Sequence, residues 1–194
     1  MAEVSDELLV YKTTNGDIDA FGQLVSRYQH QIYDLTYRML QHPEDAKDAT
    51  QEIFIKAHGS LASFQYQSKF STWLYKVASN HCLDYIRKRN SESKHRITQE
   101  FDPQTHIQCP KGGDDSGDPV DALIQKEEFQ KIQAALLALP ETYRLPLVLQ
   151  HYRHMSYQEI ALAMDISAKN VATRIHRAKM MLKNTLAGGN GYEL

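Results

Sequence analysis

The chain has 194 residues, of which 42% are hydrophobic, and a formal net charge of −2 at pH 7. This length suits one domain or two small ones, and no run approaches the roughly 20 apolar residues of a membrane span. Two distant cysteines, Cys82 and Cys109, give no disulfide framework and no cysteine-rich zinc site. The acidic start MAEVSDELLV has no signal-peptide pattern, so a cytoplasmic protein without membrane insertion is expected.

Periodic apolar residues predict helices through the first 90 residues. A short helix is expected over 6–12 and a long one from about Asp17 to Leu40. Pro43 ends the long helix at the residue before it and takes the first position of the next, over 43–61. The expected buried face of the long helix runs for more than five turns and consists of Ile18, Phe21, Leu24, Tyr28, Ile32, Leu35 and Met39.

The outer side of the helix over 43–61 is acidic and polar. Asp48, Gln51 and Glu52 lie on it, one helical turn apart or adjacent. Ordinary solvation explains such a face as well as a binding partner does.

An aromatic loop and a basic helix follow. Residues 61–71 are read as a polar loop with three exposed aromatics, Phe64, Tyr66 and Phe70. The next helix, from about Thr72 to Arg89, ends in three basic residues. Rings that stack bases beside charges that follow phosphates are typical of single-stranded nucleic acid binding. The alternative is that Trp73 anchors the core and that the three basic residues, Arg87, Lys88 and Arg89, complement the helix C-terminus.

Periodicity disappears over 91–118, where Gly, Pro, Asp and Ser are frequent. We interpret this segment as a flexible linker between two small helical domains, 1–90 and 119–187, with a disordered tail over 188–194. The second domain begins with a helix ended by Pro140, followed by one over 141–154 that has Pro146 in its first turns. No strand pattern occurs, so the fold class is all-α.

Residues 156–183 read as a helix-turn-helix. Ser156 and Glu159 form a capping box, and Ser167 can cap a second helix after a break. The turn of such motifs often holds a glycine in the left-handed conformation. Here the position is Asp165, a residue type that tolerates this conformation better than most.

The second helix of the pair has one apolar stripe and one basic face. Five basic residues and no acid occur over 169–183. A recognition helix in the major groove would need such a face, whereas a solvated helical hairpin would also show it. The apolar stripe consists of Val171, Ile175, Ala178 and Leu182.

The residues that enzymes and metal sites need are missing. There is no Gly-rich phosphate loop, no nucleophile beside a base and no isolated carboxylate pair. His151 with His154, and His106 with Cys109, each offer two ligands where a closed metal site needs about four. The sequence therefore predicts no catalysis, no cofactor and no metal.

Taken together, the motifs resemble a bacterial RNA polymerase sigma factor of the extracytoplasmic-function (ECF) group. The combination DATQEIFIKAH, FSTWLYKVASN and SYQEIALAMDISAKNVATRIHRAK carries the resemblance, which covers nearly the whole chain except the linker. It implies a subunit that binds core RNA polymerase through its clamp helices and flap. It further implies recognition of promoter −35 and −10 elements, a stress response, an anti-sigma partner and a free monomer.

The resemblance also assigns residues in both domains. Those matching the surface that binds the clamp helices are Asp48, Gln51 and Glu52. Those matching or lying near the pocket that captures a flipped −10 base are Phe64, Lys69, Trp73, Lys76 and Asn80. Those on the −35 recognition surface are Lys169, Asn170, Thr173, Arg174, Arg177 and Lys179.

The chain departs from the family pattern at two places. Ala172 stands where many relatives have Arg or Lys, so one contact to the −35 element is absent. Lys76 and Val77 occupy the positions of the aromatic doublet with which primary sigma factors hold the duplex fork open. Opening is therefore expected to depend more on a close match to the promoter.

Two other classes of function fit parts of the sequence. A polymerase-independent helix-turn-helix regulator would bind a palindrome as a two-fold dimer. A protein–protein adaptor would leave the basic helix solvated, and its binding would be insensitive to salt. Neither needs both an aromatic loop and an acidic face over 44–52.

Overall fold

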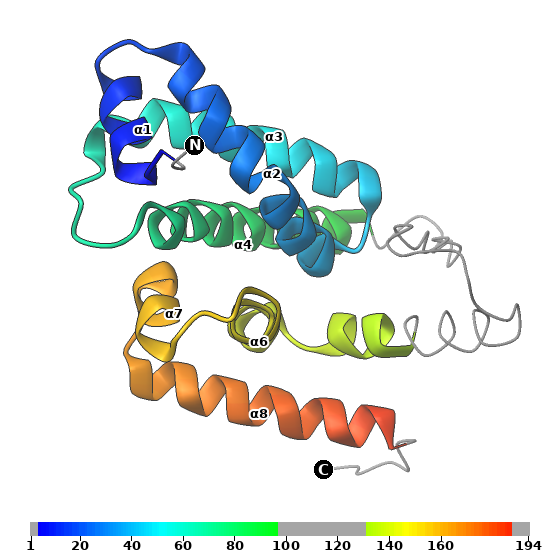
Figure 1. Ribbon diagram of the computed structural model, residues 1–194. Helices are drawn as coiled ribbons and strands as arrows, with labels where there is room; N and C mark the ends of the chain where they lie inside the picture. Colours follow the sequence, from blue (N-terminus) through cyan, green and yellow to red (C-terminus); the bar gives the residue numbers. More distant parts are fainter. Residues whose placement is uncertain (1–3, 97–130, 188–194) are drawn as a thin grey trace, which may run out of the picture.

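The computed structural model describes residues 4–96 and 131–187, and these residues form helices joined by short connections (Figure 1). The predicted all-α class and the helix-turn-helix are confirmed. The expected linker beyond residue 96, the first turns of the helix expected after 119, and the tail over 188–194 lie outside the described residues. The helices are α1 (Asp6–Thr14), α2 (Ile18–Leu40), α3 (Pro43–Ser60), the 3₁₀ turn η1 (Leu61–Ser63), α4 (Phe70–Arg96), a helix over 131–138, α6 (Glu141–Arg153), α7 (Tyr157–Met164) and α8 (Ala168–Leu186).

Side-chain caps set where the first long helices begin and end. The carboxylate of Asp17 accepts a hydrogen bond from the Ala20 N–H (3.0 Å) at the start of α2. Gln41 ends α2 in the left-handed conformation, with φ of 57°. The backbone N–H of Asp45 donates to the His42 ring at the start of α3, where Pro43 stands at the first helical position, as predicted.

The N-terminal unit, residues 4–96, packs α1, α3 and α4 around α2. Leu24, Ile32, Leu35 and Met39 of α2 are fully buried, which confirms most of the predicted face. Ile18 was expected on that face but is 78% exposed. It is the first residue of α2.

Helix α4 is longer than the sequence pattern indicated. It begins at Phe70, inside the expected loop, and continues past Arg89 to Arg96. Residues 91–96 were assigned to the linker, and that assignment is wrong for their conformation. Residues 87–92 are exposed, so no apolar periodicity marks the later turns of the helix.

The C-terminal unit, residues 131–187, contains the helix-turn-helix. The Ser156 side chain accepts from the Glu159 N–H (3.2 Å), and the Glu159 carboxylate accepts from the Ser156 N–H (2.9 Å), so the predicted capping box is present. Asp165 ends α7 with φ of 54°, the left-handed conformation expected of the turn. Ser167 caps α8 through the Asn170 N–H, as predicted.

The two units lie directly against each other. Helix α7 packs on α4, and α6 packs on α2 (Figure 1). Their apolar side chains join in one continuous cluster that includes residues from both units. Within the ranges described, no helix is both long and apolar enough to cross a bilayer.

Candidate nucleic-acid interface

A pocket of about 380 Å³ opens between the η1–α4 connection and the start of α4. It lies where the sequence predicts single-stranded nucleic acid binding, and it brings together three of the five residues expected there. The lining residues are Ser63, Phe64, Gln65, Gln67, Ser68, Thr72, Trp73, Lys76 and Leu162.

The aromatic rings of this region form a connected group. The Phe64 ring lies 4.8 Å from that of Tyr66 and 5.6 Å from that of Trp73, measured between centroids. All three aromatics of the loop were expected to be exposed, which is wrong for two of them: Phe64 is 6% exposed and Phe70 1%. Both contribute to the core of the N-terminal unit, while half-buried Trp73 packs against the same core.

Tyr66 is the aromatic residue that faces solvent, with 50% of its surface exposed. It holds a left-handed backbone conformation, with φ of 56°, which is unusual for an aromatic residue. The side-chain amide nitrogen of Gln67 donates a hydrogen bond to the side-chain oxygen Oε1 of Gln65 (3.1 Å). The sequence analysis placed Tyr66 in the loop but did not single out the two glutamines, which supply part of the polar lining of the pocket.

The other two predicted residues lie outside the pocket lining. Asn80 is exposed on α4, one helical turn beyond Lys76. Lys69 points toward the C-terminal unit, where its ammonium lies 3.3 Å from the Glu159 carboxylate. Hydrogen bonds from the Ser156 N–H and hydroxyl, and then the Lys69 ammonium, hold the pKa of Glu159 below its usual range.

A second candidate surface lies on the outer face of α3. Asp48, Gln51 and Glu52 are all exposed there, as predicted. Ile55 shares this face at the following turn, and its side chain is 70% exposed. This exposed apolar side chain, which the sequence analysis did not single out, could be buried by a partner that binds the face.

A groove of about 350 Å³ lies between α3, at Glu52 and Lys56, and residues 81–92 of α4. His81 lies at its base, buried, with Nδ1 2.7 Å from the Lys56 ammonium and Nε2 3.9 Å from the Glu52 carboxylate. Burial, and then the charge of Lys56, lower the pKa of His81, although Glu52 and Asp84 oppose the shift.

The lowered pKa of His81 makes stability dependent on pH. The unfolded chain takes up this proton near the ordinary pKa of about 6.5, before the folded chain does. The free energy of unfolding should therefore fall as pH decreases from 7.5 to 5.5, measured by urea denaturation. His81→Gln should flatten this dependence, and His30→Gln, an exposed control, should not. An unchanged slope in His81→Gln would contradict the assignment.

The recognition surface on α8 is open to solvent. Lys169, Asn170, Thr173 and Arg177 are exposed, while Arg174 is half-buried at one edge. Lys179 is also exposed but lies at the opposite edge, by the helical period. Opposite this surface, Val171, Ile175 and Ala178 are buried and Leu182 is half-buried, which confirms the predicted stripe.

The remaining reactive groups support no separate chemistry. No group of three or more His, Cys, Asp or Glu residues suited to a metal occurs in the described part of the chain. The pair His106 and Cys109 lies outside it. Burial raises the pKa of the Cys82 thiol to about 12, so this side chain is an inert part of the core.

A helix-turn-helix whose second helix presents an exposed basic face is typical of a DNA-binding transcription factor. Comparison with known protein families identifies which kind of transcription factor the chain is. Sigma-70 region 2 matches residues 24–92, and Sigma-70, region 4 matches residues 129–182. The chain is 35% identical to the ECF RNA polymerase sigma factor SigW of Bacillus subtilis, over 91% of this chain and 94% of that protein. It is 32% identical to the ECF RNA polymerase sigma-E factor of Escherichia coli K12, over 94% of each.

Solved structures show the same fold. CnrH in complex with the cytosolic domain of CnrY superposes with a TM-score of 0.68 at 23% identity, covering 94% of this chain and 97% of that one. The sigma factor RpoE in complex with the anti-sigma factor NepR from Bartonella quintana also gives 0.68, at 19% identity, over 88% and 99%.

The chain belongs to the ECF RNA polymerase sigma factors. It is a transcription initiation factor that directs promoter recognition with RNA polymerase, and it is not an enzyme. Family membership decides against a polymerase-independent regulator and against an adaptor.

Proposed function

We propose that the two units read separate promoter elements, 119–187 as the −35 domain and 1–90 as the −10 and polymerase domain. The observation that carries this division is the contrast between their surfaces. The exposed α8 face is basic and convex, as a major-groove reader requires. The N-terminal unit offers a pocket walled by aromatic rings, which suits an unstacked base.

On α8, Asn170 and Thr173 lie near the N-terminus, the part of a recognition helix that reaches base edges. Lys169 and Arg177 are exposed beside them, suited to phosphate or guanine contacts. Arg174 and Lys179, at the two edges, would contact the backbone on either side of the groove. Ala172 provides no polar group, so the −35 preference is expected to differ from that of relatives with Arg or Lys there.

In the N-terminal unit, the base extruded from the −10 element would enter between Trp73 and the two glutamines, Gln65 and Gln67. Extrusion costs a few kcal/mol, which stacking and hydrogen bonds in the pocket offset. Phe64 forms the floor of the pocket. Tyr66 offers an exposed ring beside Phe64, Lys76 lines the pocket, and Lys69 and Asn80 lie before and beyond it in the chain.

The exposed α3 face, with Asp48, Gln51 and Glu52, is proposed to contact the clamp helices of core polymerase. Its acids suit a basic partner, and Ile55 supplies an apolar contact in their midst. The flap is proposed to contact the C-terminal unit.

Arg177→Ala should weaken binding of the holoenzyme to a promoter by about 1–3 kcal/mol if its guanidinium contacts a base. Arg174→Ala should do so only if the half-buried side chain turns outward on binding. The measurement is a promoter titration at two salt concentrations, with Lys183→Ala in the last turn of α8 as the control. If both arginine variants bind the promoter as the wild type does, α8 must contact DNA through a different face.

An anti-sigma protein is also proposed as a partner. RpoE of Bartonella quintana is held in a complex with the anti-sigma factor NepR, CnrH is held in one with the cytosolic domain of CnrY, and this chain shares their fold. Affinity capture of the full chain from unstressed cells should recover one stoichiometric partner and should leave little free sigma factor. Recovery of a free monomer under those conditions would argue against sequestration.

A further inference from the structure

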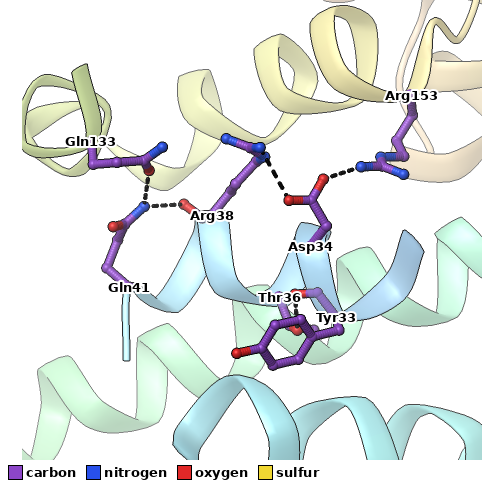
Figure 2. Close-up of polar contacts among 7 residues, drawn as sticks. All are labelled: Tyr33, Asp34, Thr36, Arg38, Gln41, Gln133 and Arg153. Atoms are coloured by element: carbon purple, nitrogen blue, oxygen red, sulfur yellow. Dashed lines mark hydrogen bonds and ion pairs between the residues drawn. The ribbon is translucent and has the colours of Figure 1, made fainter. Parts of the chain in front are cut away.

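Charged side chains of different helices meet both between the two units and in the groove beside the α3 face. Between the units, Asp34 of α2 forms ion pairs with Arg38 (3.1 Å) and with Arg153 at the end of α6 (Figure 2). Each of these charges faces an opposite charge. The groove between α3 and α4 differs, because its buried histidine lacks a partner at one ring nitrogen within the described residues.

His81 lies at the base of this groove, and its two ring nitrogens have different surroundings. Nδ1 is 2.7 Å from the Lys56 ammonium, which can only donate, so Nδ1 accepts this hydrogen bond and Nε2 carries the proton. Nε2 is buried without a hydrogen-bond partner in the part of the chain that the structure describes, and His81 as a whole is 7% exposed. The Glu52 carboxylate lies 3.9 Å from Nε2, just beyond hydrogen-bonding distance.

The carboxylate best placed to approach Nε2 is that of Glu52. Its side chain is 62% exposed and therefore free to move. Asp84, the next acid along the groove, is paired with Arg87 on its own helix (2.9 Å). The titratable and charged groups that line the groove with His81 come from α3 (Glu52, Lys56) and from α4 (Asp84, Tyr85, Lys88, Arg89, Glu92).

A second proton on His81 would reverse both of its contacts. Nδ1 would then present an N–H to the Lys56 ammonium, with two positive charges side by side, so Lys56 would leave. Nε2–H would attract the Glu52 carboxylate, which needs to approach by only about 1 Å to form a charge-assisted hydrogen bond. Lys56 and Glu52 lie one turn apart on α3, so the exchange alters the face proposed to bind core polymerase.

We propose that His81 is a positioning residue for the polymerase contact: the neutral ring holds Lys56 and leaves Glu52 free, whereas the protonated ring releases Lys56 and captures Glu52. The inference rests on the proposed function of the α3 face. Capture withdraws an anion that a basic partner must first release, so acid weakens core binding. Burial, and then the charge of Lys56, lower the pKa of His81, so the loss occurs below the ordinary histidine value of about 6.5.

The test is a titration of labelled full-length protein with purified core polymerase at several pH values from 7.5 to 5.5. His81→Asn retains an acceptor for Lys56 but gains no proton. The ratio of wild-type to His81→Asn affinity cancels the pH response of the polymerase itself. This ratio should fall about three- to ten-fold over the range, and one proton limits the change to about ten-fold per pH unit. A constant ratio would overturn the inference.

Two further variants keep the native ring and decide the question if His81→Asn does not fold. Glu52→Gln offers no anion to capture, so its affinity should lose the dependence on pH that the wild type shows. Lys56→Met removes the charge that opposes the second proton, so its loss of affinity should begin at a higher pH. The wild-type pH response in either variant would overturn the exchange of partners.

The matched control is His30→Gln, which removes an exposed histidine of the same unit and should keep the wild-type pH response. A flat response in His30→Gln would overturn the assignment of the effect to His81. The charge reversal of Asp48→Lys with Glu52→Lys is titrated in parallel at pH 7.5. Wild-type affinity in that variant would refute the proposed polymerase contact itself, whatever the pH series shows.

Discussion

Reversing two charges on the outer face of α3, with Asp48→Lys and Glu52→Lys together, should weaken binding to core RNA polymerase by at least about 100-fold. Both side chains are exposed in the free protein, so the change leaves the core of the N-terminal unit intact. In the complex it would set two cations against the basic partner surface in place of two anions. Binding is measured by titrating labelled protein with purified core enzyme.

The matched control carries the same change in net charge elsewhere on the N-terminal unit. Glu7→Lys with Asp19→Lys alters two exposed acids on α1 and α2 and should bind core as the wild type does. Ile55→Ser should weaken binding to core RNA polymerase about ten-fold. The side chain is exposed in the free protein and would be buried at the centre of the contact, so the substitution removes apolar surface that binding would bury. Wild-type affinity of the α3 charge reversal would place the polymerase contact on another surface.

The second large effect is expected at the −10 pocket. Tyr66→Ala with Asn80→Ala should reduce promoter opening by about ten-fold or more while core binding stays unchanged. The Tyr66 ring is exposed and available for stacking, worth about 1–3 kcal/mol per base. Permanganate reactivity of unpaired thymines in the −10 region measures the opening.

Two other variants separate a role in DNA binding from a role in folding. Phe64→Ala removes a buried ring and should lower the stability of the protein itself by about 3–5 kcal/mol, so its loss of opening would not identify a base contact. Tyr11→Ala removes a comparably exposed tyrosine of α1 and should leave opening intact. Full permanganate reactivity in the double variant, or an equal loss of core binding, would contradict the pocket assignment.

Local signals in the sequence predicted the helices and their ends well. The capping box of Ser156 and Glu159, the proline at the start of α3 and the left-handed Asp165 depend on neighbouring residues alone. The buried stripe of α8 follows from its period. Residues 87–92 of α4 are exposed and no apolar pattern follows them, so the end of the helix at Arg96 could not be predicted.

Burial in the aromatic loop depends on contacts that no local pattern contains. Phe64 is buried because its ring meets Trp73 on α4, and Phe70 is buried as the first residue of α4, where its ring meets Tyr28 of α2. Tyr66 points outward from the same loop because its backbone turns left-handed between them. The polar residues around the three aromatics suggested that all three are exposed, and this is correct for Tyr66 alone among them.

The contact between the two units was also beyond the reach of the sequence. Asp34 and Arg153 are separated by 119 positions, and each reads as an ordinary surface charge in its own helix. The family resemblance placed Lys69 near the −10 pocket, but its partner in this structure is Glu159 of the other unit. Pairings of this kind depend on how the two helical units meet in space.

Transcript 5′-end mapping tests the central claim most directly. Core RNA polymerase, with and without this protein, transcribes fragmented genomic DNA of its own organism in vitro, and the starts are sequenced. We predict a set of starts that requires the protein and shares two upstream elements with centres about 25 base pairs apart, read by α8 and by the pocket beside α4. Identical start sites with and without the protein would contradict the assignment of a sigma subunit with two promoter-reading surfaces.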